Sequence, residues 1–322
     1  MAATNSYDFY EKLSVLLVRA EAAFRPCSLS LSIPIMNADP LYLPSNANVA
    51  YPLNWSLSVF GKVTLPSPVA CIDQLRESVR TDELKILEFL YRPPNVALFF
   101  VSSQPTANPS QIIRSIKGRW QNISRPTHPI EFRRNYRITA VGTVNSEVLD
   151  SYVCNQTSRH PMADTEVQLM IESIQFHDVD VDLNSLLRSN HGEYRYALHL
   201  VFESDGGWHE VRPAVLTSYR DAIIKSCSKH NWRLSRIGLL SNHLHILVGA
   251  GIEDSPNDVA LAFLNNMAFV QGMKPVFRFS FFAGTYGEYD RGAIWNSMER
   301  EGDAASARTG RTESFPIDSI GM

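Results

Sequence analysis

The residues best suited to chemistry in this sequence are two histidines in the apolar stretch 239–248. His243 and His245 are one residue apart, and side chains on the same face of a β-strand repeat every two residues. Both imidazoles therefore point to one side of a predicted strand, while Leu244 and Ile246 point to the other. Such a pair can hold one divalent ion and leave coordination positions open for substrate. The competing interpretation is two half-buried or surface histidines without a ligand.

A second chemical feature is a basic segment between positions 109 and 140. It contains seven Lys or Arg residues against Glu131 alone, a local balance of +6 in a chain whose formal net charge is −3. The segment is either a solvated face or a surface for phosphate groups, with Trp120 available to stack on an unpaired base. The candidate DNA-binding residues are Arg114, Lys117, Arg119, Trp120, Arg133, Arg134 and Arg137.

Length and composition restrict the class of protein. A chain of 322 residues can form two domains, and 44% hydrophobic with 20% charged residues is typical of a soluble globular protein. No apolar run approaches the roughly 18 residues that span a bilayer, and residues 1–19 lack the pattern of a cleavable signal. We therefore expect a cytoplasmic protein. Four scattered cysteines without a Cys-x-x-Cys pair indicate neither a zinc knuckle nor a disulfide framework.

The predicted secondary structure repeats along the chain. We expect strands at 54–60, 85–91, 95–101 and 136–141 with helices at 69–80, 109–120 and 146–156, then strands at 194–202, 232–240, 242–248 and 276–285 with helices at 217–230, 256–270 and 290–301. The same β-α-β-β-α-β-α order thus occurs twice, which predicts an α+β protein built from a tandem duplication. The expected segments are an extension (1–52), a first repeat (53–156), a linker (157–193), a second repeat (194–301) and a flexible tail (302–322).

The two repeats can be aligned at the level of residues. Residues 95–101 align with 243–248, residues 135–143 with 279–285, and residues 148–156 with 293–301. In this alignment the repeats have specialised in opposite directions. The first has Tyr152 but carries Asn95 and Ala97 where the histidines would be, and the second has the histidines but carries Ser297 opposite the tyrosine.

This paired pattern resembles the single-tyrosine HUH transposases of the insertion-sequence 200/605 group and their repeat-associated relatives. Their motifs are a His-hydrophobic-His strand, a strand of the type Ser-Phe-Phe-Ala-Gly-Thr, present here at 280–285, and a helix reading Tyr-(Val/Ile)-x-Asn-Gln, present here at 152–156. The second repeat resembles the family over residues 194–301, and the first, more weakly, over residues 53–156.

The resemblance implies a fold and an active site. In that family each site combines the histidine pair of one subunit with the tyrosine helix of the other, so a chain with both repeats would be two tandem ferredoxin-like domains in a fused pseudo-dimer. One composite site would use Tyr152 as catalytic nucleophile and His243, His245 and Gln156 as ligands of Mg²⁺ or Mn²⁺. The opposite site would be inactive.

The resemblance also implies an activity. The expected function is metal-dependent cleavage and strand transfer of single-stranded or hairpin DNA through a 5′-phosphotyrosine intermediate, by a transposase or a domesticated derivative that acts as a monomer. A tyrosine oxygen can attack phosphorus and conserve the energy of the broken phosphodiester for rejoining. Because a phenol is largely protonated at neutral pH, it needs a nearby cation or base.

Other assignments remain open at this stage. Tyr286 and Tyr289 are nearer in sequence to the histidines and are alternative nucleophiles. His199 and His209 have no partner at metal-binding spacing, so we interpret them as structural or exposed. The alternative functions are a noncatalytic protein that binds hairpin or single-stranded DNA, and a small-molecule metal hydrolase. The hydrolase would use only the histidine pair and leave Tyr152 unexplained.

Overall fold

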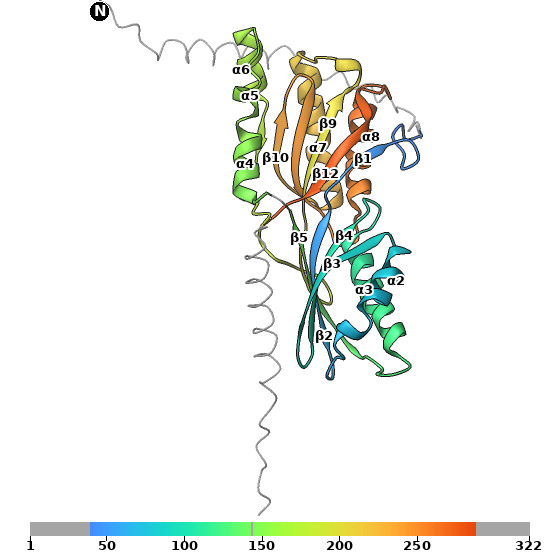
Figure 1. Ribbon diagram of the computed structural model, residues 1–322. Coiled ribbons are helices and arrows are strands. Elements are labelled where there is room, and N and C mark those ends of the chain that lie inside the picture. Colours follow the sequence, from blue (N-terminus) through green and yellow to red (C-terminus); the bar gives the residue numbers. More distant parts are fainter. Residues whose placement is uncertain (1–38, 143, 288–322) are drawn as a thin grey trace, which may run out of the picture. The chain divides into compact units, whose positions relative to one another are not determined.

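The computed structural model describes residues 39–142 and 144–287 (Figure 1). Residues 1–38 of the predicted extension, the helix predicted at 290–301 and the tail at 302–322 lie outside these residues. Within the described ranges, no helix combines the length and the apolar character that crossing a membrane requires.

The first repeat forms an antiparallel sheet covered on one face by helices (Figure 1). Its elements are β2 (Asn54–Gly61), a 3₁₀ turn η1 (Pro68–Ala70), α2 (Ile72–Arg80), β3 (Leu84–Arg92), β4 (Val96–Ser103), α3 (Pro109–Ser124) and β5 (Phe132–Val141). The four strands lie in the order β3-β4-β2-β5. If the four strands are numbered 1 to 4 by their position in the sequence, this order across the sheet is 2-3-1-4, the arrangement of a ferredoxin-like fold.

The second repeat has the same topology. Its elements are β9 (Ala197–Ser204), a 3₁₀ turn η2 (Asp205–Gly207), α7 (Pro213–His230), β10 (Arg233–Leu239), β11 (His243–Gly249), α8 (Pro256–Val270) and β12 (Phe277–Thr285). The strand order β12-β9-β11-β10 is 4-1-3-2, which is the first order read from the other edge. The prediction of two tandem ferredoxin-like α+β domains is therefore confirmed.

Local sequence signals start the long helices. Asn108 and Gln111 form a reciprocal capping box ahead of α3, and Pro109 occupies its first turn. At α8 the Ser255 side chain accepts from the backbone N–H of Asp258. These caps fix where each helix begins, and thus where it lies against its sheet.

Short edge strands extend both sheets, and two of them are exchanged between the repeats. β1 (Asn48–Ala50) precedes the first repeat but pairs in parallel with β12 of the second. β8 (Glu193–Arg195) precedes the second repeat but pairs in parallel with β5 of the first. With β6 (Phe176–His177) on β10 and β7 (Leu187–Arg188) on β8, each sheet has six strands. The structure divides the strand predicted at 194–202 into β8 and β9, and β1, β6 and β7 were not predicted from sequence.

Three helices connect the repeats and follow one side of β10 (Figure 1). They are α4 (Ser146–Cys154), α5 (Gln156–Arg159) and α6 (Thr165–Ser173). Of the three, α6 lies wholly within the segment predicted as a linker. Gln175, just after α6, exchanges hydrogen bonds with the backbone of Leu239 on β10, its Oε1 accepting at 2.8 Å and its Nε2 donating at 2.8 Å. The segment between the repeats is thus tied to the second sheet.

The ends of β5 and β12 meet where the two sheets adjoin. The Thr285 hydroxyl donates to the carbonyl of Val141 at 2.7 Å and accepts from the backbone N–H of Asn54 at 2.8 Å. Gly142 lies against the same strand end, and a Cβ at this position would be 2.3 Å from the Thr285 carbonyl oxygen. Only a residue without a side chain fits here while the strands stay in place.

We expect Gly142→Ala to destabilise the protein by at least about 1–3 kcal/mol, because the new methyl group meets backbone atoms that cannot rotate away. Gly118, inside α3, provides the matched control: a Cβ there meets nothing within 4 Å. Gly118→Ala is expected to stabilise by up to about 1 kcal/mol through helix propensity. Urea denaturation of both variants tests this junction, and equal midpoints for Gly142→Ala and the parent chain would contradict it.

Candidate active site where the first repeat meets the second sheet

The two predicted histidines leave one face of β11. Leu244, Ile246 and Val248 belong to the main hydrophobic core, so His243 and His245 point to the opposite face. β11 lies between β9 and β10, and both neighbours hold it by antiparallel pairing. The strand therefore presents the two imidazoles from the interior of the sheet.

His245 has a histidine partner that sequence reasoning missed. His199 Nε2 and His245 Nδ1 are 2.9 Å apart, and the two rings are stacked with an interplanar angle of 13°. His199 lies on β9 opposite Leu247, diagonally across from His245. With Nδ1 engaged, His245 Nε2 is left buried without a hydrogen-bond partner in the described structure. Only the pairing register of β9 with β11 reveals this contact.

His243 is also held by one ring nitrogen. Its Nδ1–H donates to the side-chain Oδ1 of Asn242 at 2.8 Å, which leaves Nε2 with the lone pair. Burial lowers the pKa of His199, His243 and His245 below the ordinary value, and the neighbouring histidines lower that of His245 further. All three imidazoles are therefore neutral near pH 7, the form that binds metals.

Helix α4 carries the predicted tyrosine onto this sheet. The Arg236 guanidinium on β10 donates two hydrogen bonds to the Asp150 carboxylate, at 2.7 and 2.8 Å. Leu149 and Val153 pack in a small apolar cluster with Leu247. A Cβ at Gly238 of β10 would lie 2.8 Å from Val153 Cγ1, so the missing side chain allows the close approach of the helix. An ion pair, an apolar face and a glycine together hold α4.

Tyr152 consequently lies beside His245. The ring centroids are 5.7 Å apart in an edge-to-face arrangement, although the two residues belong to different repeats. The guanidinium carbon of Arg159 lies 5.1 Å from the centroid of the Tyr152 ring, within the range of a cation–π contact. A phenol, two neutral imidazoles and a guanidinium thus meet at one location.

The motif helix is interrupted before Gln156. The sequence predicted one helix from 146 to 156, but α4 ends at Cys154, and Gln156 begins the four-residue helix α5. Gln156 is 1% exposed, and neither of its side-chain amide atoms has a hydrogen-bond partner in the described structure. It lies four residues after Tyr152 and four before His160, whose ring contacts that of His243 at 5.4 Å. Gln156 is thus flanked in sequence by residues that contact both histidines.

The donor atoms at this location are those of two histidines and one glutamine. The described residues include no group of three or more His, Cys, Asp or Glu side chains arranged to hold one. A site of two histidines and one glutamine is of a different composition. His245 Nε2 and the amide atoms of Gln156 are buried polar atoms without partners in the described structure, and such atoms are costly unless something binds them. Imidazole nitrogens and an amide oxygen are donor types that a divalent ion can take.

The alternative nucleophile Tyr286 is not available for chemistry. It is 4% exposed and packs in the cluster beneath α4, and burial raises its pKa well above the ordinary value. Tyr289, the other alternative, and Ser297 lie outside the described residues. His209 is exposed, with Nδ1 2.9 Å from the Ser241 hydroxyl, as expected for a residue outside the site.

The first repeat lacks histidines at the equivalent face, but the sequence alignment there is wrong by one residue. Ala97 belongs to the main core under the helices, whereas Val96 and Leu98 occupy the opposite face of β4. The positions that share a face with His243 and His245 are therefore Val96 and Leu98, in place of Asn95 and Ala97. A shift of one residue in a strand moves every side chain to the other face.

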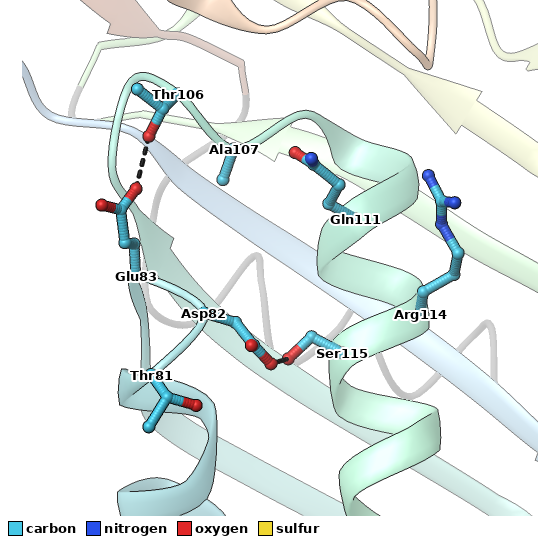
Figure 2. Close-up of a pocket in the computed structure, with 8 residues that line it drawn as sticks. All are labelled: Thr81, Asp82, Glu83, Thr106, Ala107, Gln111, Arg114 and Ser115. Atoms are coloured by element: carbon cyan, nitrogen blue, oxygen red, sulfur yellow. Dashed lines mark hydrogen bonds between the residues drawn. The ribbon is translucent and has the colours of Figure 1, made fainter.

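Most of the predicted DNA-binding cations already have partners. Arg119 donates to both oxygens of Asp82, at 2.8 and 3.0 Å, and these bonds lower the pKa of Asp82. Figure 2 shows Asp82 turned towards α3, where its Oδ2 accepts from Ser115, while Arg114 points away from it. With Glu83 on the same side of α3, this face presents two carboxylates and is unsuited to phosphate.

Of the remaining basic candidates, some have side chains bound within the protein and one does not. Lys117 Nζ donates to the Arg133 carbonyl at 2.6 Å, Arg133 Nε donates to the carbonyl of Gly61, and Arg137 pairs with Glu193 at 2.6 Å. Arg114 forms a long ion pair with Glu253 at 3.4 Å. Arg134 is exposed and forms no ion pair within the described ranges.

Trp120 is fully buried between Phe99 and Phe132, with ring centroids 5.7 and 5.5 Å away. The prediction that it stacks on a base is therefore wrong. It follows Ile112 and Ile116 at four-residue intervals, which places all three on the core face of α3.

Comparisons with known proteins leave the family open. No family model matches the chain, and no curated protein matches it. A solved structure of a REP-associated tyrosine transposase bound to a REP hairpin is 14% identical, covering 39% of this chain and 86% of that one, with a TM-score of 0.27. A glycine cleavage system transcriptional repressor is 8% identical, covering 73% and 98%, with a TM-score of 0.20. The regulatory subunit of aspartate kinase from Thermus thermophilus is 6% identical, covering 66% and 92%, with a TM-score of 0.18. At these TM-scores none of the three carries an inference about function.

The neutral histidines make stability depend on pH. Below the ordinary histidine pKa of 6.5 the unfolded chain takes up protons that the buried His199 and His245 do not. The free energy of unfolding should therefore fall with decreasing pH, with a slope that approaches about 1.4 kcal/mol per pH unit for each histidine only once the pH is well below 6.5. Urea denaturation between pH 7.5 and 5.5 with a chelator present measures the slope. His199→Gln should make it shallower, and a flat profile in the parent chain would contradict the buried neutral pair.

Proposed function

We propose that the protein is a metal-dependent endonuclease and strand transferase for single-stranded DNA, with Tyr152 as the nucleophile of one composite site. The observation that carries the proposal is the 5.7 Å contact between the Tyr152 and His245 rings, which come from different repeats. A helix of the first repeat completes a histidine site of the second, which is the arrangement that the motifs imply for two subunits of the resembled transposases.

Tyr152 would act by in-line attack of its phenolic oxygen on a backbone phosphorus. The phenol loses its proton to solvent as the 5′-phosphotyrosine ester forms, and the bond from phosphorus to the 3′ oxygen breaks, so that the released strand end takes up a proton and becomes a 3′ hydroxyl. Arg159, whose guanidinium lies over the Tyr152 ring, would stabilise negative charge on the phenol oxygen and on the phosphate. A returning 3′ hydroxyl reverses the step and rejoins the strand.

His243, His245 and Gln156 would hold the divalent ion, Mg²⁺ or Mn²⁺, through the two Nε2 atoms and Gln156 Oε1. Bound there, the ion would polarise the phosphate and offset the negative charge that develops during transfer. Asn242 Oδ1 accepts from Nδ1–H of His243, so that Nε2 of this ring would keep its lone pair, and the contact of His199 with His245 Nδ1 would leave Nε2 of His245 as the uncommitted nitrogen. These contacts orient the histidines before any ion binds.

The arrangement supports one active site per chain. The β4 face that corresponds to the histidine strand carries Val96 and Leu98, which cannot bind a metal. We therefore propose that the chain acts as a monomer, an internal pseudo-dimer, and that it nicks and rejoins strands folded into hairpins. A transposase and a domesticated derivative both fit this chemistry.

The test is covalent capture of labelled DNA. Hairpin oligonucleotides labelled at the 5′ or the 3′ end are incubated with the protein and Mn²⁺, and adducts are separated on denaturing gels and mapped by mass spectrometry. We expect one adduct per chain, on Tyr152, that falls to background in Tyr152→Phe and on chelation of the metal. Tyr286→Phe is the matched control, because it removes the hydroxyl of the nearby buried tyrosine.

Three results would reject the proposal. An adduct that persists in Tyr152→Phe would place the nucleophile elsewhere. Retention of the hairpins without an adduct under any divalent metal would indicate the noncatalytic DNA-binding protein instead. Hydrolysis of small esters without DNA retention would favour a metal hydrolase.

A further inference from the structure

A cleft of about 760 Å³ lies on the side of α3 away from Asp82. Its walls come from α3, from β5, from the β7–β8 hairpin and from the segment that joins β11 to α8. The volume is within the range of about 300–1,000 Å³ typical of small-ligand sites. The β7–β8 hairpin and the segment between β11 and α8, which we predicted only as connections, thus form walls of this cleft beside α3.

The lining of the cleft is cationic. Arg114, Lys117, Arg134 and Arg188 bring four positive charges, and Glu253 is the one acidic side chain among the lining residues that the structure describes. Arg134 and Arg188 are exposed, and neither forms an ion pair within residues 39–142 and 144–287. Two guanidinium groups are therefore free to bind an anion in a fork geometry that suits phosphate.

The hairpin that carries Arg188 is fixed in position. The Ser189 hydroxyl bonds to the Tyr136 hydroxyl at 2.7 Å and accepts from the backbone N–H of Gly192 at 3.0 Å. A Cβ at Gly192 would lie 2.4 Å from the Tyr136 carbonyl oxygen, so this glycine permits the hairpin to lie directly on β5. Arg188 therefore comes from an anchored turn, which reduces the entropy lost when it binds a ligand.

We propose that this cleft binds a nucleotide unit, with its phosphate on Arg134 and Arg188 and its base against the apolar wall of Ile113, Ile252 and Tyr194. The unit is either a free nucleotide or one residue of a single strand. For a strand, the proposal rests on the nucleic-acid substrate proposed above and adds a second contact separate from the tyrosine site. It keeps the predicted Arg134 as a phosphate contact and adds Arg188, which the sequence did not suggest.

Gly118 allows a direct test, because it lines the cleft and a Cβ there meets nothing within 4 Å. Gly118→Glu places a carboxylate in the cleft, and Gly118→Ala is the matched control without charge. Both are made in the Tyr152→Phe chain with metal chelated, so that cleavage plays no part. Binding of a fluorescent ten-nucleotide single strand is measured by anisotropy, with an unlabelled mononucleotide as competitor.

We expect Gly118→Glu to weaken binding of the strand at least about ten-fold, through like-charge repulsion, and Gly118→Ala to bind within about two-fold of the parent. Arg134→Ala and Arg188→Ala should each reduce the slope of log K against log salt by about 0.7. The two arginine variants alter exposed side chains, so they provide the test if Gly118→Glu fails to fold. Competition by the mononucleotide identifies a free-nucleotide site, and its absence identifies a strand site.

Unchanged binding and salt slopes in all the cleft variants would overturn the inference. That result can be separated from failure of the proposed function. If DNA forms a covalent adduct on Tyr152 but Gly118→Glu binds the strand as tightly as the parent chain, only the proposal for the cleft is rejected. If Gly118→Glu weakens strand binding but no adduct forms in the capture experiment, only the proposed nuclease activity is rejected.

Discussion

The candidate site depends on the docking of α4 against β10 of the second repeat. The Asp150–Arg236 ion pair crosses from one repeat to the other; the Arg236 side chain is 10% exposed, whereas that of Asp150 is 41% exposed. Removing Asp150 would leave the largely buried Arg236 guanidinium without its partner, which is costlier than losing an exposed pair. Gly238 permits the contact and Leu149 adds apolar burial. Without this docking, Tyr152 would have no reason to lie near His245.

Three buried polar atoms without hydrogen-bond partners lie at this interface. His245 Nε2 and both amide atoms of Gln156 are enclosed but make no hydrogen bond, and each such group costs about 1–3 kcal/mol. Other nitrogens of the same histidines are fully engaged, by His199 and Asn242. The contrast between satisfied outer atoms and unsatisfied inner ones is what a ligand-binding centre requires, because its binding atoms must stay uncommitted until the ligand arrives.

The sequence predicted the regular elements well and the contacts between them unevenly. α8 has the predicted bounds because Ser255 and Pro256 mark its start. β4 is buried on both faces, so its apolar run has no alternation to set the register, and the alignment slipped by one residue. Trp120 was assigned to DNA from its charged neighbours, although its spacing from Ile116 indicated the core. The partnership of His199 with His245 depends on strand pairing, which no local pattern encodes.

The exchange of β1 and β8 bears on how such a chain could have arisen. Each segment lies immediately ahead of one repeat and completes the sheet of the other. A shorter ancestor with a single copy of the fold would leave that edge open, and could close it only by borrowing the segment from a second molecule, as in domain swapping. When two such molecules are joined end to end, the exchange of edge strands takes place within a single chain. Severing the connection would return both halves to dependence on each other.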